Sequence, residues 1–289
     1  MATPASTVKG PRVLIVDAHP DDETAYAVTV YKIVHDLHGT VDLVVVTNGE
    51  AGYKYSTLAS AYYGYDLTNE AVGRAHLPKI RHDELLAAGK VIGLHHIYFL
   101  EQRDNRYTRD PHEVLDSNWN VPKVRQELRS ILMKGGYDFV FDLLPEDSTH
   151  GHHKAATILS LEAIRDLPQG VPHPVALAGS ISSADRPSPR FRELAGFPIT
   201  RMADTVPLFH LDRKQHFGFR KSLTYQIIVN WEIAEHKSQG ALQLGMGMGD
   251  TEEFYLYAMN EPSARSKAEA LFASLAAQVY PELTYPGIR

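Results

Sequence analysis

The chain of 289 residues contains no cysteine. This absence excludes disulfide bonds and every metal site that depends on thiolate ligands. A metal ion would therefore have to be held by histidine, aspartate or glutamate. The 15 histidines leave that option open.

Strong positive charge and long apolar runs are also missing. The formal net charge is −6, so a polyanion such as nucleic acid is not an expected partner. No apolar run reaches the roughly 18 residues that a bilayer-spanning helix needs. Residues 1–11 lack the apolar core of a signal peptide and are expected to be flexible. These features predict a cytoplasmic protein without a transmembrane segment.

Short apolar runs rich in β-branched residues alternate with segments that carry apolar residues at helical spacing. Such runs are typical of strands buried on both faces, as in parallel sheets. The expected strands are 12–17, 41–47, 96–100, 138–144 and 174–180, and the expected helices are 23–37, 80–92, 121–133 and 153–165. The alternation predicts an α/β fold with a Rossmann-like, mostly parallel sheet and helices on both faces.

The pattern weakens in residues 185–289. A late strand over 207–211 and helices over 217–236 and 264–279 are still expected. Because no linker marks a boundary, we predict a single domain over residues 1–289, in which the C-terminal part completes the cleft.

Two segments are long for loops: 51–77, which contains five tyrosines, and 102–120, which is polar and charged. Long loops in compact folds are often functional. Each segment follows an expected strand, and open α/β sheets bind ligands beyond the carboxyl ends of their strands. The tyrosines of the first segment could stack on a sugar ring or simply pack on the surface.

The sequence AHPDDE at 18–23 directly follows the first expected strand. His19 and Asp22 are three residues apart, so both side chains could reach one spot if a helix begins after Pro20. An imidazole and a carboxylate are ligands for a divalent ion. Without a metal, the acidic residues of this turn would simply favour a helix N-terminus electrostatically.

A second polar turn, PEDSTHGHHK at 145–154, directly follows the fourth expected strand. The first and fourth strands of a doubly wound sheet are commonly adjacent, so both turns would face one crevice. His19, Asp22 and either His150 or His153 would then form a three-ligand site with an open fourth position, as in catalytic zinc sites. A solvated histidine cluster without a function is the alternative.

The AHPDDE turn resembles the signature of the PIG-L/LmbE-like de-N-acetylases. That family includes the enzyme of glycosylphosphatidylinositol synthesis and the deacetylases of mycothiol and bacillithiol synthesis. Four further segments resemble its motifs in the same order: TNGEAG at 47–52, RHDE at 81–84, HGHHKA at 150–155 and AEHKSQ at 234–239. The resemblance extends from residue 12 to about residue 256.

The resemblance implies a zinc-dependent hydrolase that removes the N-acetyl group from an N-acetylglucosamine-type sugar or conjugate. It implies that His19, Asp22 and His153 bind Zn²⁺, with other divalent metals as alternatives. Asp21 would be the general base. His150 would stabilise the tetrahedral oxyanion as an imidazolium.

The resemblance also suggests substrate-binding residues. The family places an arginine near the sugar in the region of Arg81. Asn48 and Glu50 lie in the turn after the second strand, and His236 would line the cleft or lie on the surface of the late helix. The expected partner is a small amino-sugar substrate, and the sequence is compatible with a homo-oligomer.

One position departs from the family pattern. The family commonly has an aspartate before the second histidine of H-x-D-H, where this chain has His152. If that aspartate tunes His150, another acid must replace it, and Asp147 is close in sequence. The cationic role of His150 depends on this replacement.

Two other functions stay open on the sequence. An amidase acting on a larger glycoconjugate, such as a thiol conjugate or an acylated glycopeptide, would use the long segments to shape a large cleft. A metal- or carbohydrate-binding protein without turnover would fit the change at His152. The presence of Asp21 favours an enzyme, because binding alone needs no base beside the metal.

The glycine-rich sequence GMGMGD at 245–250 superficially resembles a dinucleotide-binding loop. No expected strand precedes it and no clear helix follows it. We therefore expect a loop at the edge of the cleft.

Overall fold

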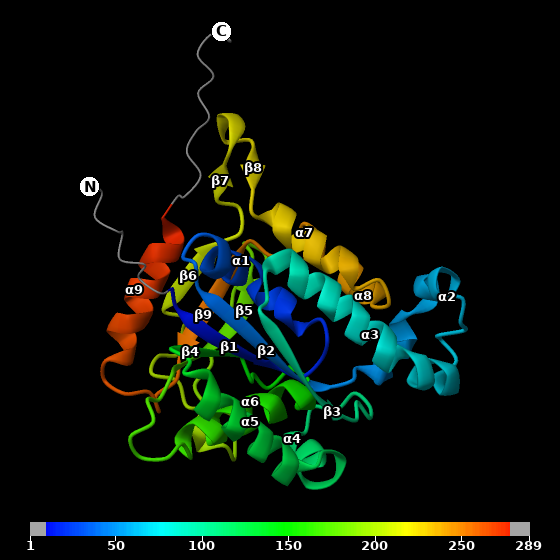
Figure 1. The fold of residues 1–289 in the computed structure, drawn as a ribbon, viewed down its shortest axis with the longest axis horizontal. Coiled ribbons are helices and arrows are strands. Elements are labelled where there is room, and N and C mark those ends of the chain that lie inside the picture. Colours follow the sequence, from blue (N-terminus) through cyan, green and yellow to red (C-terminus); the bar gives the residue numbers. More distant parts are fainter. Residues whose placement is uncertain (1–9, 278–289) are drawn as a thin grey trace, which may run out of the picture.

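The computed structural model describes residues 10–277. Residues 1–9 of the N-terminal segment that was expected to be flexible (1–11) lie outside the described residues. The end of the last expected helix also lies outside them. A seven-stranded sheet with the order β3-β2-β1-β4-β5-β9-β6 forms the centre of the fold (Figure 1). Its strands are β1 (Arg12–Asp17), β2 (Thr40–Thr47), β3 (His96–Gln102), β4 (Phe139–Leu143), β5 (Val175–Ser182), β6 (Phe209–Asp212) and β9 (Thr251–Leu256).

The first five strands are parallel to one another, and β9 is antiparallel to both β5 and β6. The predicted α/β fold with a mostly parallel sheet is therefore confirmed. Strand β9 was not expected from the sequence. Glu252, its second residue, is fully buried, and an acidic residue at that position hides the apolar pattern of a buried strand.

Helices cover both faces of this sheet (Figure 1). One face packs on α5 and α6, and the other packs on α1, α3, α7 and α9. The α-helices are α1 (Ala27–His35), α2 (Thr57–Tyr63), α3 (Glu70–Ile92), α4 (Pro111–Glu113), α5 (Val121–Gly135), α6 (Gly151–Arg165), α7 (Gln226–Glu235), α8 (Gly240–Gln243) and α9 (Ala264–Ala276). Shorter elements are the 3₁₀ turns η1 (Asp22–Tyr26), η2 (Glu50–Tyr55), η4 (Pro198–Thr200) and η5 (Phe219–Lys221), and the π-helical turn η3 (Val114–Asn118).

The first expected loop is largely helical, so this part of the sequence prediction was wrong, whereas the second is irregular over 103–110 and helical over 111–118. Segment 51–77 contains most of η2, all of α2 and the first turns of α3, and segment 102–120 contains α4 and η3. Helix α3 was missed in part because Pro78 lies inside it, and proline normally predicts the end of a helix. The capping side chain of Asn69 fixes the true start of α3 by accepting hydrogen bonds from Ala71 N and Val72 N.

The expected helix over 217–236 begins only at Gln226. A two-stranded hairpin of β7 (His216–Phe217) and β8 (Leu223–Thr224) precedes it. Gly218 has a φ of 74° at this turn, a conformation that ends a helix and that glycine adopts without steric cost.

The sheet brings the two polar turns of the sequence together. Strands β1 and β4 are hydrogen-bonded parallel neighbours, with Val16 opposite Asp142 near their carboxyl ends. The turn with AHPDDE follows β1, and the turn with the histidines follows β4 and leads into α6. In residues 10–277, no helix is both long and apolar enough to cross a bilayer.

Candidate metal centre and its surroundings

The turn after β1 fixes the carboxylate of Asp22. Its Oδ2 atom accepts hydrogen bonds from the backbone N–H groups of His19, at 2.8 Å, and Ala18, at 3.1 Å. The chain then enters η1 instead of the regular helix that was expected. Because the turn itself holds Asp22, its remaining oxygen atom can face the second turn.

The start of α6 presents His153 and His150. The Nδ1 atom of His153 lies 3.1 Å from Thr149 Oγ1, which leaves its Nε2 free to face the first turn. His150 is the N-cap of α6, and its Nδ1 accepts a hydrogen bond of 3.0 Å from the backbone N–H of His152. Both rings are therefore oriented by contacts within their own turn.

His19, Asp22 and His153 converge across the sheet edge. His19 Nδ1 lies 3.0 Å from His153 Nε2 and 3.4 Å from Asp22 Oδ2, and His153 Nε2 lies 3.2 Å from Asp22 Oδ1. Ligand atoms around a tetrahedral zinc ion are separated by roughly 3.3 Å, given Zn–N and Zn–O distances of about 2.0–2.2 Å. The three donors therefore fit a small divalent cation in both type and spacing.

The electrostatics of this group also favour positive charge between the two turns. Burial alone would lower the pKa of His19, but Asp22, with smaller effects from Asp104 and Asp21, raises it to about 9. Burial would raise the pKa of Asp22, yet His153 and His19 hold it well below its ordinary value. A divalent cation would supply this positive charge directly.

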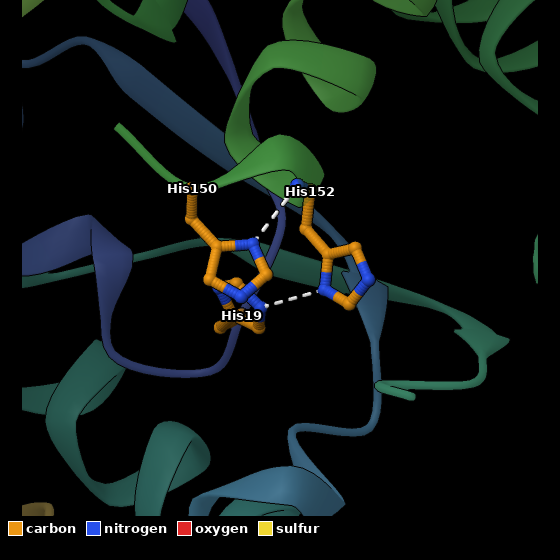
Figure 2. A group of neighbouring side chains, drawn as sticks. All are labelled: His19, His150 and His152. Carbon is orange, nitrogen blue, oxygen red and sulfur yellow. Dashed lines mark hydrogen bonds between the residues drawn. The ribbon is translucent and has the colours of Figure 1, made fainter. Parts of the chain in front are cut away.

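A second group of nitrogen donors shares His19. Figure 2 shows His19, His150 and His152 with their rings close together. His19 Nε2 lies 3.1 Å from Nδ1 of His152, which is fully buried. The ring of His19 is thus contacted through both nitrogens, and partners of this kind fix the orientation of a metal-binding histidine.

Asp104 completes this side of the site and was missed in the sequence. Its Oδ1 lies 3.4 Å from His152 Nδ1 and 4.0 Å from His19 Nε2. Burial would raise the pKa of Asp104, but a hydrogen bond from His152 and the charge of His19 keep it below its usual range. Asp147, the acid that the sequence suggested, is exposed. The only sequence signal for Asp104 was its place in a polar segment after a strand.

The surroundings of His150 favour its neutral form over the imidazolium that the resemblance implies. Burial lowers its pKa to about 3, and the neighbouring His19, His152 and His153 add to the effect. Because Nδ1 accepts the backbone hydrogen bond, the proton of the neutral ring belongs on Nε2. His150 is therefore a neutral N–H donor beside His19, at a ring distance of 5.1 Å.

Asp21 is held by Arg81. Arg81 Nη2 lies 2.8 Å from Asp21 Oδ1, and the guanidinium also donates to the backbone oxygens of Gly49 and Pro20. Only 3% of the Arg81 side chain is exposed, against 19% for Asp21. The resemblance suggests that Arg81 lies near the sugar, which stays a prediction; in the structure Arg81 contacts the expected base.

The other three expected substrate-binding residues have surroundings different from those of His19, His150, His152 and His153. Asn48 lines a cavity of about 440 Å³ together with Pro20 and Phe99. Glu50 is buried and accepts a hydrogen bond from the backbone N–H of Asp104. His236 is fully buried, and its Nε2 lies 2.6 Å from Oε1 of Glu23. Glu50 and His236 therefore contact residues that lie next to the site, Asp104 and Glu23 respectively.

Comparison with known proteins gives one family match. A family model described as PIG-L, GlcNAc-PI de-N-acetylase, matches residues 14–164, just over half of the chain. The matched segment includes both turns of the candidate centre. No curated protein sequence matches the chain.

Solved structures share the fold at low sequence identity. The 4-carboxy-2-hydroxymuconate hydratase GalB of Pseudomonas putida KT2440 is 13% identical with a TM-score of 0.56, over 87% of this chain and 97% of that chain. A deacetylase of the teicoplanin biosynthesis pathway is 16% identical with a TM-score of 0.51, over 86% of this chain and 100% of that chain. At these identities the likeness concerns the fold alone.

Proposed function

Because the chain belongs to the GlcNAc-PI de-N-acetylase family, we propose that it is a zinc-dependent hydrolase that deacetylates an N-acetylglucosamine-type sugar or conjugate. The convergence of His19, Asp22 and His153 beside Asp21 and a neutral His150 carries this proposal. The fold alone does not choose the reaction, since a hydratase shares it. The family match and the side chains of the site are what favour amide hydrolysis.

His19, Asp22 and His153 would hold the ion with three protein ligands, the number found in catalytic zinc sites. When bound, a divalent ion there would supply Lewis acidity and lower the pKa of a water molecule. The hydrogen bonds to Asp22 and the contact of Thr149 with His153 keep these ligands in place before the ion arrives. The protein's own part in the reaction then falls to Asp21, Arg81 and His150.

Asp21 would act as the general base. It accepts the proton of the attacking water as the oxygen bonds to the carbonyl carbon of the acetamide. The contact with Arg81 fixes one of the two oxygens of this carboxylate. The other oxygen stays available to the water molecule.

His150 would stabilise the tetrahedral oxyanion by donating a hydrogen bond from Nε2. A neutral donor fixed in place before the reaction stabilises charge that develops in the transition state. The carbon–nitrogen bond then breaks, and the sugar nitrogen takes the proton that Asp21 received. The products are acetate and a free amino sugar.

The proposal is tested by measuring acetate release from a methyl glycoside of N-acetylglucosamine. We expect turnover by the zinc-loaded protein, loss of turnover after chelation, and recovery when zinc is restored. In Asp21→Asn we expect turnover to fall by at least about 10²-fold, which is typical for loss of an acid–base group, while zinc content is unchanged. Asp147→Asn, at an exposed acid of the second turn, is the matched control and should keep full turnover. Full activity in Asp21→Asn would refute the mechanism.

We also propose that the described residues form a single domain. Strands β5, β9 and β6 extend the sheet that begins with β1, so the C-terminal part shares one core with the N-terminal part. Limited proteolysis that releases a stable fragment ending near residue 185 would contradict this proposal.

A further inference from the structure

A cavity of about 510 Å³ adjoins the candidate metal centre and shares His153 with it. It lies beyond the carboxyl ends of β4 and β5, and its other walls come from the start of α6, from α7, from α8 and from the glycine-rich segment 245–249. A volume of this size is within the range of about 300–1,000 Å³ that is usual for small-molecule sites.

The lining of this cavity is more apolar than polar. Its apolar residues include Leu143, Ile181, Ile233 and Leu242. Its polar and charged residues include Thr149, Ser180, Glu146, Arg186 and Arg213. A cavity with both kinds of lining suits a ligand that carries an apolar part as well as polar groups.

Two large apolar side chains that line the cavity are mostly exposed to solvent. Leu244 is 80% exposed and Met248 is 62% exposed, and both line the cavity. Exposed apolar groups gathered at a cavity mark an interaction site, and methionine adapts easily to ligands of different shape. Met246 lies between them in the chain, is 38% exposed and is not part of the lining.

We propose that this cavity binds an apolar aglycone attached to the amino sugar. This inference rests on the proposed deacetylation, because the departing acetyl group has only two carbons and cannot fill such a volume. The large apolar group must therefore be on the sugar side of the amide. His153 belongs both to the metal centre and to the lining of the cavity. A group bound in the cavity would therefore lie next to the reacting amide. This position favours a part of the substrate, and not a protein partner, as the occupant.

The first test compares methyl, n-butyl and n-hexyl β-glycosides of N-acetylglucosamine. Burial of each methylene group corresponds to about a fourfold gain in binding, so we expect kcat/KM to rise by roughly tenfold or more from methyl to n-butyl. The double variant Leu244→Asn/Met248→Asn should lose most of this gain and keep the activity on the methyl glycoside. Met246→Asn, the matched control in the same segment, should keep the full gain.

The second test measures binding without turnover. In Asp21→Asn, calorimetry of the same three glycosides should show dissociation constants that fall with chain length, and the added Leu244→Asn/Met248→Asn changes should abolish that trend. Hydrolysis at a rate independent of chain length, with binding equally independent of it, would overturn the aglycone site while the proposed function stands. Chain-dependent binding without any hydrolysis would leave the site standing and remove the proposed function.

Two further outcomes would assign the cavity to another occupant. A gain with longer N-acyl chains on the methyl glycoside, lost in the double variant, would place the acyl group there and overturn the proposal. A dimer that dissociates in the double variant and persists in Met246→Asn, as measured by sedimentation, would make the segment a subunit contact and would likewise overturn it.

Discussion

The carboxylate of Asp21 and the guanidinium of Arg81 form a contact of 2.8 Å between residues that are 60 positions apart in the chain. Arg81 is almost fully buried in α3, whereas Asp21 is partly open to solvent. The buried arginine therefore fixes the carboxylate, and the carboxylate is the more accessible of the two groups.

Arg81→Met is expected to lower both stability and turnover. Removing one partner of a buried ion pair typically costs about 3–5 kcal/mol, and Asp21 would lose its fixed orientation. We expect kcat to fall by more than about tenfold with zinc content unchanged, and urea unfolding to occur at lower denaturant. Arg81→Lys should restore only part of both, because an ammonium cannot reach all three acceptors at the angles of a guanidinium.

The control for this prediction is Lys79→Met on the same helix. Lys79 pairs with Asp83 at 2.7 Å, and both side chains are mostly exposed. Such exposed pairs contribute about 0–1 kcal/mol, so kcat and the urea midpoint should hardly change. Equal effects of Arg81→Met and Lys79→Met would argue against a positioning role for Arg81.

Asp104→Asn is expected to weaken metal binding. Asp104 faces His152 and His19 from one side, and loss of a partner that orients a metal-binding histidine typically costs 10–100-fold in affinity. The measurement is competition for zinc with a chromophoric chelator. Asp116→Asn, at an exposed acid paired with His112, should leave the affinity unchanged, and unchanged affinity in Asp104→Asn as well would contradict the prediction.

Glu252→Ala is expected to destabilise the fold strongly. The buried carboxylate accepts hydrogen bonds from Val28 N, Thr29 N, Thr29 Oγ1 and Arg213 Nε. Its loss would leave buried donors and the Arg213 charge without a partner, at a cost of about 3–5 kcal/mol in the free energy of unfolding. Glu193→Ala, which removes an exposed partner of Arg201, should cost less than about 1 kcal/mol. Urea unfolding of the two variants checks the difference.

Asp142→Asn is expected to change how stability depends on pH. Burial raises the pKa of Asp142 well above its ordinary value of 3.8, and an interaction with Ser160 offsets only part of this effect. The folded state therefore keeps a proton that the unfolded state releases. The stability from the protonated carboxyl is fully present below about pH 3.8 and is lost as the pH rises through the folded-state pKa.

The amide in Asp142→Asn does not titrate, so the variant should gain stability relative to the natural protein as the pH rises from 4 to 9. Urea unfolding at several pH values measures this difference. Comparison of the two proteins cancels the titrating groups that do not interact with Asp142, whereas the pKa of Asp17, which Asp142 helps to raise, changes with it. A difference that stays constant over the whole range would mean that Asp142 is ionised in the folded protein throughout.

Local pattern was sufficient for the parallel part of the sheet. The continuous apolar runs of β1, β2 and β4 are typical of strands in a sheet that is buried on both faces. In the structure these strands are buried in the central sheet. The adjacency of β1 and β4 then followed from a general rule of doubly wound sheets. This adjacency is enough to predict that the turn with His19 and the turn with His153 face each other.

Local pattern failed where a buried charge replaced an apolar residue. Glu252 in β9 and Glu23 beside His236 are fully buried, yet acidic residues normally indicate a solvated position. Helix α3 was shortened for a related reason, since its surface is largely polar and Pro78 interrupts it.

By itself, the sequence determined the parallel part of the sheet, the family and the two turns that carry the donors, because each depends on residues close together in the chain. Only the tertiary structure decided that Arg81 faces Asp21, that Asp104 faces His152 and that His236 is buried against Glu23. The partner of a buried charge is chosen by whichever opposite charge or donor the folded chain brings within a few ångströms. That choice leaves no periodic signal in the sequence.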